Sequence, residues 1–205
     1  MNADFFRSFG LYVAHDFLER DLCARLRAEA TAAATAPATV RQQGTEYVVN
    51  DEIRRTHLAR VSDGSEELIE QRLTTLKETL ERHFGVTTTG IRQPQFLVYG
   101  EGGFFRPHAD SSRDADAPTV ATGRRVSIVI FLNGEDETGR GDSYSGGSLT
   151  FYGLMRDARA DDRGFPLTGE AGLLVAFPSD VVHSVTPVTR GMRFTIVSWL
   201  EGEAS

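Results

Sequence analysis

The sequence predicts a mainly β domain with flanking helices (α+β), an antiparallel sandwich or jelly roll that two helices cover on one face. Three observations predict this fold. Two amphipathic stretches lie in the N-terminal part, short β-rich runs follow residue 92, and clusters of Gly, Pro, Asn or Asp separate those runs. We expect a single domain over residues 1–205, with a helical portion at about 1–92 packing on a β core at about 93–200.

Two helices are expected in the N-terminal portion. The first covers residues 16–35, with Asp16 as N-cap, and its apolar residues recur at one-turn spacing: Leu18, Leu22 and Leu26. The second runs from about Ser65 to Phe84 and ends at Gly85. Its apolar stripe comprises Ile69, Leu73, Leu76, Leu80 and Phe84. Both read as structural cover for the core.

Six β-rich runs make up the rest of the predicted core. They are "PQFLVYG", "RVSIVIFLN", "GGSLTFYG", "GLLVAFP", "HSVTPV" and "RFTIVSWL". No helical period intervenes between them, which favours many short strands joined by turns. The acidic, glycine-rich "NGEDETGRGDSYSG" and the segment "DARADDRG" read as solvated connections rather than binding sites.

Bulk composition limits the classes of partner and the compartment. The hydrophobic share of 40% and the charged share of 25% are those of an ordinary soluble domain. No apolar run reaches membrane-spanning length, and the N-terminus does not read as a secretory signal. A net charge of −7 argues against nucleic acid as a partner. A single cysteine, Cys23, fits a reducing cytoplasm. The only lysine is Lys77, so nearly every cation is arginine.

The tripeptide "HAD" places a base and an anion two residues apart. On a strand, His108 and Asp110 would share a face and reach one point. Alone the pair is a weak signal, since a polar strand end gives the same letters. His183 opens the run "HSVTPVTRGMRFTIVSWL", which we predict to be a hairpin of two strands. Two imidazoles and a carboxylate on one face of Fe(II) form the non-haem oxygenase site, whereas a lone histidine is more often structural.

A cation near the second histidine would hold an anionic co-substrate. Arg193 begins an apolar run, where an arginine is unfavourable unless it meets an anion, whereas Arg190 lies in the turn. If Thr189, Arg190 and Gly191 form a three-residue loop with a left-handed Gly191, Arg193 shares a face with His183. A two-residue loop would put the two side chains on opposite faces.

With these residues in place, the sequence strongly resembles the Fe(II)/2-oxoglutarate-dependent dioxygenases, in their prolyl 4-hydroxylase-like branch. That family carries Tyr-x-x-Gly-x-x-aromatic-x-x-His-x-Asp, a Gly-Gly strand, and a distal His with a basic residue about ten positions later. The matching residues here are Tyr99, Gly102, Phe105, His108, Asp110, Gly146, Gly147, His183 and Arg193, followed by Trp199. The resemblance covers about residues 94 to 200.

The resemblance implies a double-stranded β-helix with iron held by His108, Asp110 and His183. It also implies that 2-oxoglutarate chelates the iron, with its far carboxylate on Arg193 and a hydrogen bond from Tyr99. Ordinary core packing is the alternative role for Tyr99. The implied cofactors and co-substrates are Fe(II), 2-oxoglutarate and O2, with ascorbate as a candidate reductant. Phe105 stands where the family often has tyrosine, so a hydrogen bond there is lost or supplied elsewhere.

The implied reaction is hydroxylation of an unactivated C–H bond, of prolyl hydroxylase type, with release of succinate and CO2. The expected partner is a peptide, protein or small-molecule substrate, without nucleic acid or membrane. A hydroxylase of a free amino acid or other metabolite needs the same metal site, and a non-catalytic cupin-like binding module is the non-enzymatic alternative. Residues 37–61 lie where relatives often place a substrate lid, with Tyr47, Arg54 and Arg55 as contacts, whereas "VVNDEIRRTHLARV" within them equally fits a strand pair over the core. Oligomeric state is not predicted.

Overall fold

The computed structural model describes residues 3–41, 47–111, 123–139, 141–154 and 164–203. Its helices are α1 (Ala3–Ser8), α2 (Arg20–Ala32) and α3 (Asp63–Phe84). Within these ranges, no helix combines the length and the apolar character that a membrane span requires. The predicted connection "DARADDRG" at 157–164 lies almost wholly outside the described residues.

The larger sheet is antiparallel throughout. Its strands are β1 (Tyr12–Ala14), β2 (Thr35–Pro37), β6 (His57–Ala59), β7 (Gly90–Ile91), β8 (Gln95–Tyr99), β10 (Arg124–Phe131), β14 (Leu174–Pro178) and β17 (Arg193–Glu201). They run in the order β1-β14-β10-β17-β8-β6-β2, and β7 pairs with β17. The long central strands β10 and β17 have one face toward the helices and the other toward the second sheet.

The smaller sheet is also antiparallel. Its strands are β5 (Arg54–Arg55), β9 (Phe104–His108), β12 (Leu149–Phe151), β13 (Phe165–Leu167) and β15 (His183–Val185), in the order β13-β12-β15-β9-β5. Two ribbons complete the described strands. One joins β3 (Val40–Arg41) to β4 (Tyr47–Val48), and the other joins β11 (Tyr144–Gly146) to β16 (Val188–Gly191). The predicted sandwich of two sheets is thus confirmed.

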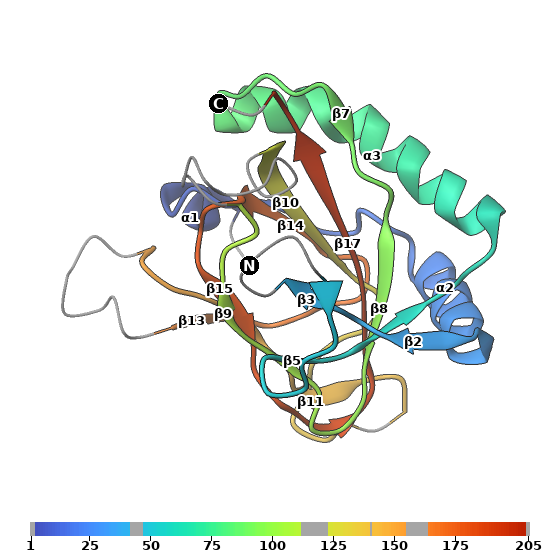
Figure 1. Ribbon diagram of the computed structural model, residues 1–205. Coiled ribbons are helices and arrows are strands. Elements are labelled where there is room, and N and C mark those ends of the chain that lie inside the picture. Colours follow the sequence, from blue (N-terminus) through green and yellow to red (C-terminus); the bar gives the residue numbers. More distant parts are fainter. Residues whose placement is uncertain (1–2, 42–46, 112–122, 140, 155–163, 204–205) are drawn as a thin grey trace.

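Alternation along β17 separates the two sides of the larger sheet. Phe194, Ile196 and Leu200 belong to the apolar cluster that α2 and α3 complete. Residues of odd number, such as Arg193 and Val197, lie on the opposite face. In Figure 1, α3 runs along the top and α2 lies at the right, while β9, β13 and β15 lie at the left beyond β17. The space between the sheets is filled mainly by a second apolar cluster: Phe6, Leu11, Val129, Phe131, Leu149, Phe151, Leu167, Leu173, Val175 and Phe177.

The two predicted helices form, but the first begins later than expected. Asp16 has a left-handed φ of 51°, so it lies in a turn, and Glu19 occupies the N-cap position of α2. The prediction of Asp16 as the cap was wrong because its spacing to the apolar residues cannot show that the chain turns first. In α3 the expected end holds: Gly85 adopts the left-handed conformation at the C-cap.

The N-terminal portion supplies strands as well as helices. β6 pairs with β8 in the larger sheet, and β5 pairs with β9 in the smaller one. Of the two readings of residues 37–61, the described part therefore matches strands laid on the core. Residues 42–46 lie outside the described residues, and no side-chain placement is described for Tyr47.

The predicted hairpin between His183 and Arg193 does not form. His183 starts β15 in the smaller sheet, whereas Arg193 starts β17 in the larger one. Between them the chain pairs with β11 through β16 and crosses from one sheet to the other. Gly191 does adopt the expected left-handed φ, at 76°. The two side chains therefore approach the inter-sheet space from opposite sheets, rather than from one face of a hairpin.

Candidate active site

Two histidines and one aspartate meet where β9 ends and β15 begins. His108 and His183 are directly opposed Cα partners on these antiparallel strands. Asp110 follows β9, and its carboxylate lies 3.7 Å from Nε2 of each imidazole. One ligand atom from each of the three side chains lies within 4.8 Å of the other two. The structure thus brings the three predicted metal-ligating side chains to one point.

Both imidazoles are oriented by backbone carbonyls. Nδ1 of His108 lies 2.8 Å from the carbonyl oxygen of Arg106, and Nδ1 of His183 lies 3.0 Å from that of Val181. A carbonyl only accepts, so each Nδ1 carries the proton, and each Nε2 presents a lone pair toward Asp110. Burial and, after it, the neighbouring His183 lower the pKa of His108 to about 3, so its imidazole is neutral at pH 7 and can bind a cation.

Asp110 is held from the opposite sheet. Its Oδ2 accepts hydrogen bonds from Ser127 Oγ at 2.7 Å and from Trp199 Nε1 at 3.0 Å. Burial acts to raise the pKa of Asp110, but the two neighbouring histidines and these hydrogen bonds outweigh it and lower the pKa to about 2. The carboxylate is therefore ionised at neutral pH, and its Oδ1 lies 3.7 Å from Nε2 of His108 and 3.8 Å from Nη1 of Arg124. Two imidazoles and one carboxylate suit Fe(II).

Aromatic rings enclose the two imidazoles. The ring of Phe105 stacks on His108, with centroids 3.5 Å apart, and Phe177 meets His183 edge-on at 4.7 Å. Phe105, which stands where the family often has a tyrosine, thus contributes its ring to the site and brings no hydroxyl. The guanidinium of Arg54 lies over the ring of Phe105, 4.7 Å from its centroid. One of the two arginines that the sequence offered as substrate contacts thus lies next to the metal-ligating residues.

Arg193 is almost fully buried, with 1% of its surface exposed. Its Nη1 donates to Thr195 Oγ1 at 3.2 Å, and the rings of Tyr99 and Phe131 lie 5.0 and 5.1 Å from its guanidinium carbon. Within the described residues its Nε has no hydrogen-bond partner. A buried guanidinium without a carboxylate partner is unfavourable unless an anion joins it. The side chain therefore fits an anionic ligand.

Tyr99 lies directly opposite Arg193 in the pairing of β8 with β17. It is 2% exposed and belongs to a small apolar cluster with Leu97, Val185 and Val188. The structure therefore places Tyr99 beside the predicted anion-binding arginine. Its ring packs against the guanidinium of Arg193.

Sequence reasoning missed three side chains of this region: Ser127, Trp199 as a donor, and Tyr144. A serine inside the apolar run "RVSIVIFLN" was the available signal for Ser127. Tyr144 lies in the segment that was read as a solvated connection, yet it is fully buried, and burial raises its pKa to about 12. The signal there was an aromatic residue two positions before the Gly146-Gly147 pair.

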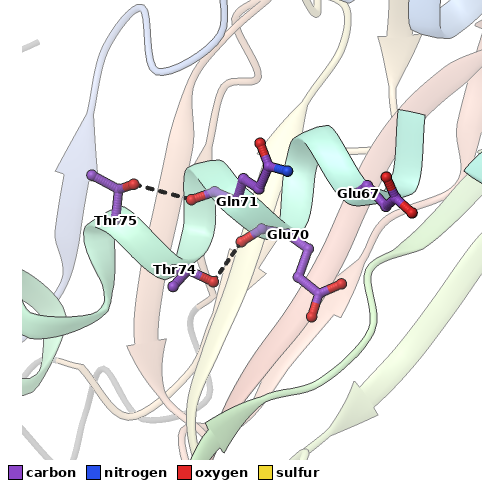
Figure 2. Close-up of a pocket in the computed structure, with 5 residues that line it drawn as sticks. All are labelled: Glu67, Glu70, Gln71, Thr74 and Thr75. Carbon is purple, nitrogen blue, oxygen red and sulfur yellow. Dashed lines mark hydrogen bonds between the residues drawn. The ribbon is translucent and has the colours of Figure 1, made fainter. Parts of the chain in front are cut away.

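An open depression of about 400 Å³ lies elsewhere, on the outer side of α3. Its lining residues are Glu67, Glu70, Gln71, Thr74 and Thr75. Figure 2 shows the hydroxyls of Thr74 and Thr75 bonded to carbonyl oxygens of Glu70 and Gln71, one turn earlier in the helix. These groups satisfy one another along the helix, and the depression includes none of the metal-ligating candidates.

Comparison with known proteins agrees with this geometry. The chain is 33% identical over 114 residues to a PKHD-type hydroxylase of Teredinibacter turnerae, covering 54% of this chain and 43% of that protein. It is 38% identical over 87 residues to one of Synechococcus sp., covering 42% and 34%. The chain thus matches less than half the length of these relatives.

Solved structures resemble the whole chain. A Pseudomonas putida prolyl-4-hydroxylase aligns with a TM-score of 0.72 at 24% identity, covering 98% of this chain and 97% of that one. A Trichoplax adhaerens prolyl hydroxylase, solved with a hypoxia inducible factor peptide fragment, aligns at 0.69 and 17% identity, covering 97% and 86%. These likenesses show the predicted fold, a double-stranded β-helix. The 2OG-Fe(II) oxygenase superfamily matches residues 94–201. Because this match spans more than half of the sequence, the chain belongs to that superfamily.

Proposed function

We propose that this chain is an Fe(II)- and 2-oxoglutarate-dependent hydroxylase in which His108, Asp110 and His183 hold the iron. One observation carries the proposal: two Nε2 lone pairs and one carboxylate converge, while each Nδ1–H donates a hydrogen bond to a backbone carbonyl. This arrangement orients every donor before a cation arrives. Membership of the superfamily implies Fe(II), 2-oxoglutarate and O2.

When bound, the iron and the keto acid supply the oxidation: O2 and 2-oxoglutarate give succinate, CO2 and one hydroxyl on the substrate. The residues of this chain orient the reactants and exclude water. Ser127 and Trp199 fix the carboxylate of Asp110, and Phe105 and Phe177 keep the imidazoles in an apolar environment. A site closed to bulk water prevents side reactions of an oxidising centre.

Arg193 is the proposed anchor for the far carboxylate of 2-oxoglutarate. Its guanidinium is buried, its Nε has no partner within the described residues, and its planar shape suits a carboxylate. Gly147 leaves room beside it, because a Cβ there would lie 3.1 Å from Arg193 Cδ. We propose that the hydroxyl of the neighbouring Tyr99 donates a hydrogen bond to 2-oxoglutarate, as the family resemblance implies.

For the substrate, we propose a prolyl residue within a peptide or protein. Support comes from the hydroxylase relatives and from the Trichoplax adhaerens neighbour, whose structure contains a peptide. A small carboxylate-bearing metabolite is the second candidate, favoured by Arg54. That side chain lies over Phe105, and its Nε is buried without a partner in the described chain. We further propose one cytoplasmic domain over residues 1–205, with ascorbate able to maintain the reduced metal.

Succinate production from 2-oxoglutarate, with Fe(II), ascorbate and air, tests the reaction. Mass spectrometry for a gain of one oxygen across proline-containing peptides and metabolites tests the substrate. Asp110→Ala should abolish both signals because it removes the only carboxylate of the triad. Asp21→Ala, at an exposed position on α2, is the matched control and should leave both unchanged. Turnover that survives Asp110→Ala would refute the proposed metal site and the non-catalytic alternative alike.

A further inference from the structure

A second polar group beside Arg193 is left without a partner. Tyr144 is 0% exposed, and its hydroxyl meets no partner at full hydrogen-bonding geometry within the described part of the chain, although Arg193 lies close enough to lower its pKa. Buried hydroxyls are nearly always satisfied, so an orphaned one indicates a group that is absent from the protein alone. The surroundings of this hydroxyl indicate what that group is.

Backbone contacts fix Tyr144 in position. Its N–H donates to the carbonyl of Gly134 at 3.0 Å, and its carbonyl accepts from the N–H of Asp136 at 2.8 Å. Through β11 it also pairs with Gly191 on β16, only two residues before Arg193. The ring is therefore held by the ribbon that carries the chain from the smaller sheet into β17. Its direction is set by the fold, without help from the hydroxyl.

Two glycines leave space for this side chain and for Arg193. A Cβ at Gly169 would lie 2.3 Å from the Tyr144 hydroxyl oxygen. A Cβ at Gly147 would lie 3.1 Å from Arg193 Cδ and 3.4 Å from Tyr144 Cε2. Gly147 thus touches both side chains, so the ring of Tyr144 and the aliphatic part of Arg193 lie side by side. We call the space that Gly147 and Gly169 leave around these two side chains the cradle.

The donors in this cradle suit an anion. Burial raises the pKa of Tyr144 to about 12, with the carboxylate of Glu135 acting in the same direction and the guanidinium of Arg193 acting against it, so the phenol keeps its proton and is a donor at neutral pH. The Arg193 Nε is likewise a donor without a partner in the described residues. A carboxylate accepts several hydrogen bonds, and a charged acceptor shared by a guanidinium and a phenol satisfies both.

We propose that the Tyr144 hydroxyl is a second donor to the far carboxylate of the keto acid that Arg193 binds. This inference rests on the proposed function and deepens it by naming a residue that selects the co-substrate. Tyr144 would distinguish keto acids that end in a carboxylate from those that end in a methyl group. Tyr99 differs, because its ring packs against the guanidinium of Arg193.

The test is Tyr144→Phe, which removes one oxygen and keeps the ring. Binding of 2-oxoglutarate and of 2-oxopentanoate is measured by calorimetry on the full chain loaded with Mn(II), which accepts similar ligands and needs no turnover. The two compounds have the same length and differ only in the terminal carboxylate. We expect 2-oxoglutarate to bind the variant about 10- to 100-fold more weakly, as for loss of a hydrogen bond to a charged group, and 2-oxopentanoate to bind unchanged.

Tyr152→Phe is the matched control, because its hydroxyl lies 3.1 Å from Ser184 Oγ. It should bind both compounds as the parent protein does. Equal 2-oxoglutarate affinity in Tyr144→Phe and parent would overturn the inference. An equal loss for both keto acids would also overturn it, since it would indicate a general structural role. A parent protein that binds Mn(II) but no 2-oxoglutarate would instead refute the proposed function itself.

Discussion

Replacing Ser127 by alanine should weaken metal binding although it changes none of the three proposed metal ligands. Ser127 Oγ donates to Asp110 Oδ2 at 2.7 Å, and Trp199 Nε1 donates to the same oxygen at 3.0 Å. These two bonds tie the carboxylate to the larger sheet, while His108 and His183 belong to the smaller one. Without the serine hydroxyl, Oδ2 keeps only the bond from Trp199 among these two, while the guanidinium of Arg124 still lies 3.8 Å from Oδ1.

The expected magnitude follows from the partner's charge. A hydrogen bond to a charged group contributes about 1.5–3 kcal/mol, and every 1.4 kcal/mol is a factor of ten in affinity. The Trp199 bond remains, and with a pKa of about 2 in the parent protein Asp110 should stay ionised at pH 7. The change is therefore lost orientation rather than protonation. We expect the dissociation constant for Mn(II) to rise about 10- to 100-fold, the usual range for groups that orient metal ligands.

Calorimetric titration of the metal-free protein with Mn(II) measures this change. Ser198→Ala is the matched control, because Ser198 is equally buried on the neighbouring strand but donates to the carbonyl of Arg92 at 2.6 Å. The control should bind Mn(II) like the parent protein. If Ser127→Ala binds within about twofold of the parent, or if both variants lose affinity equally, the reasoning on Asp110 is refuted.

Three further predictions concern the pocket and the imidazoles. Arg193→Ala should weaken 2-oxoglutarate binding at least about 30-fold, for a loss of about 2–5 kcal/mol, and unchanged affinity would contradict its role. Gly147→Ala should lower the free energy of unfolding more than Gly153→Ala. The backbone φ is similar at the two glycines, 68° and 71°, but a Cβ at Gly147 would lie 2.8 Å from Val188 Cγ2, whereas a Cβ at Gly153 would have no neighbour within 4 Å. Denaturant titration compares the two variants. Because the pKa of His108 is about 3 in the folded protein and about 6.5 for a solvent-exposed histidine, the unfolded chain binds more protons between these pH values. The free energy of unfolding of the metal-free protein should therefore fall as pH drops from 6.5 toward 3, by up to about 1.4 kcal/mol per pH unit, and it should fall less steeply in His108→Gln. If this free energy depends on pH equally in both proteins, His108 does not contribute to the dependence.

The second helix was predictable from local signals, and the convergence of His108, Asp110 and His183 was predictable from the pattern of the family. The stripe of α3 and its glycine stop are properties of neighbouring residues, so the sequence alone indicated both. His108 and Asp110 are two residues apart, and His183 follows a recognisable strand, so their convergence was predictable from the pattern of the family. The side chains confirm that convergence.

The pairing of strands that are distant in the sequence was harder to predict from the sequence. The run from His183 to Arg193 reads like a hairpin because a left-handed glycine separates two apolar strands. Only the three-dimensional pairing shows that these strands belong to different sheets. Tyr144 was missed for a related reason: an acidic, glycine-rich neighbourhood predicts exposure, whereas pairing of β11 with β16 buries this one residue. Local composition does not report such tertiary contacts.

The opposed placement of His108 and His183 on adjacent strands has a thermodynamic consequence. A cation shared by these two side chains and Asp110 acts as a cross-link between β9 and β15, and through Ser127 and Trp199 it also ties one sheet to the other. The unfolded chain cannot reproduce that geometry, so occupancy shifts the folding equilibrium by mass action, by about 2.7 kcal/mol at a free metal concentration one hundred times the dissociation constant. We therefore expect a chelator to lower the stability of the whole sandwich as well as to stop the chemistry at its centre.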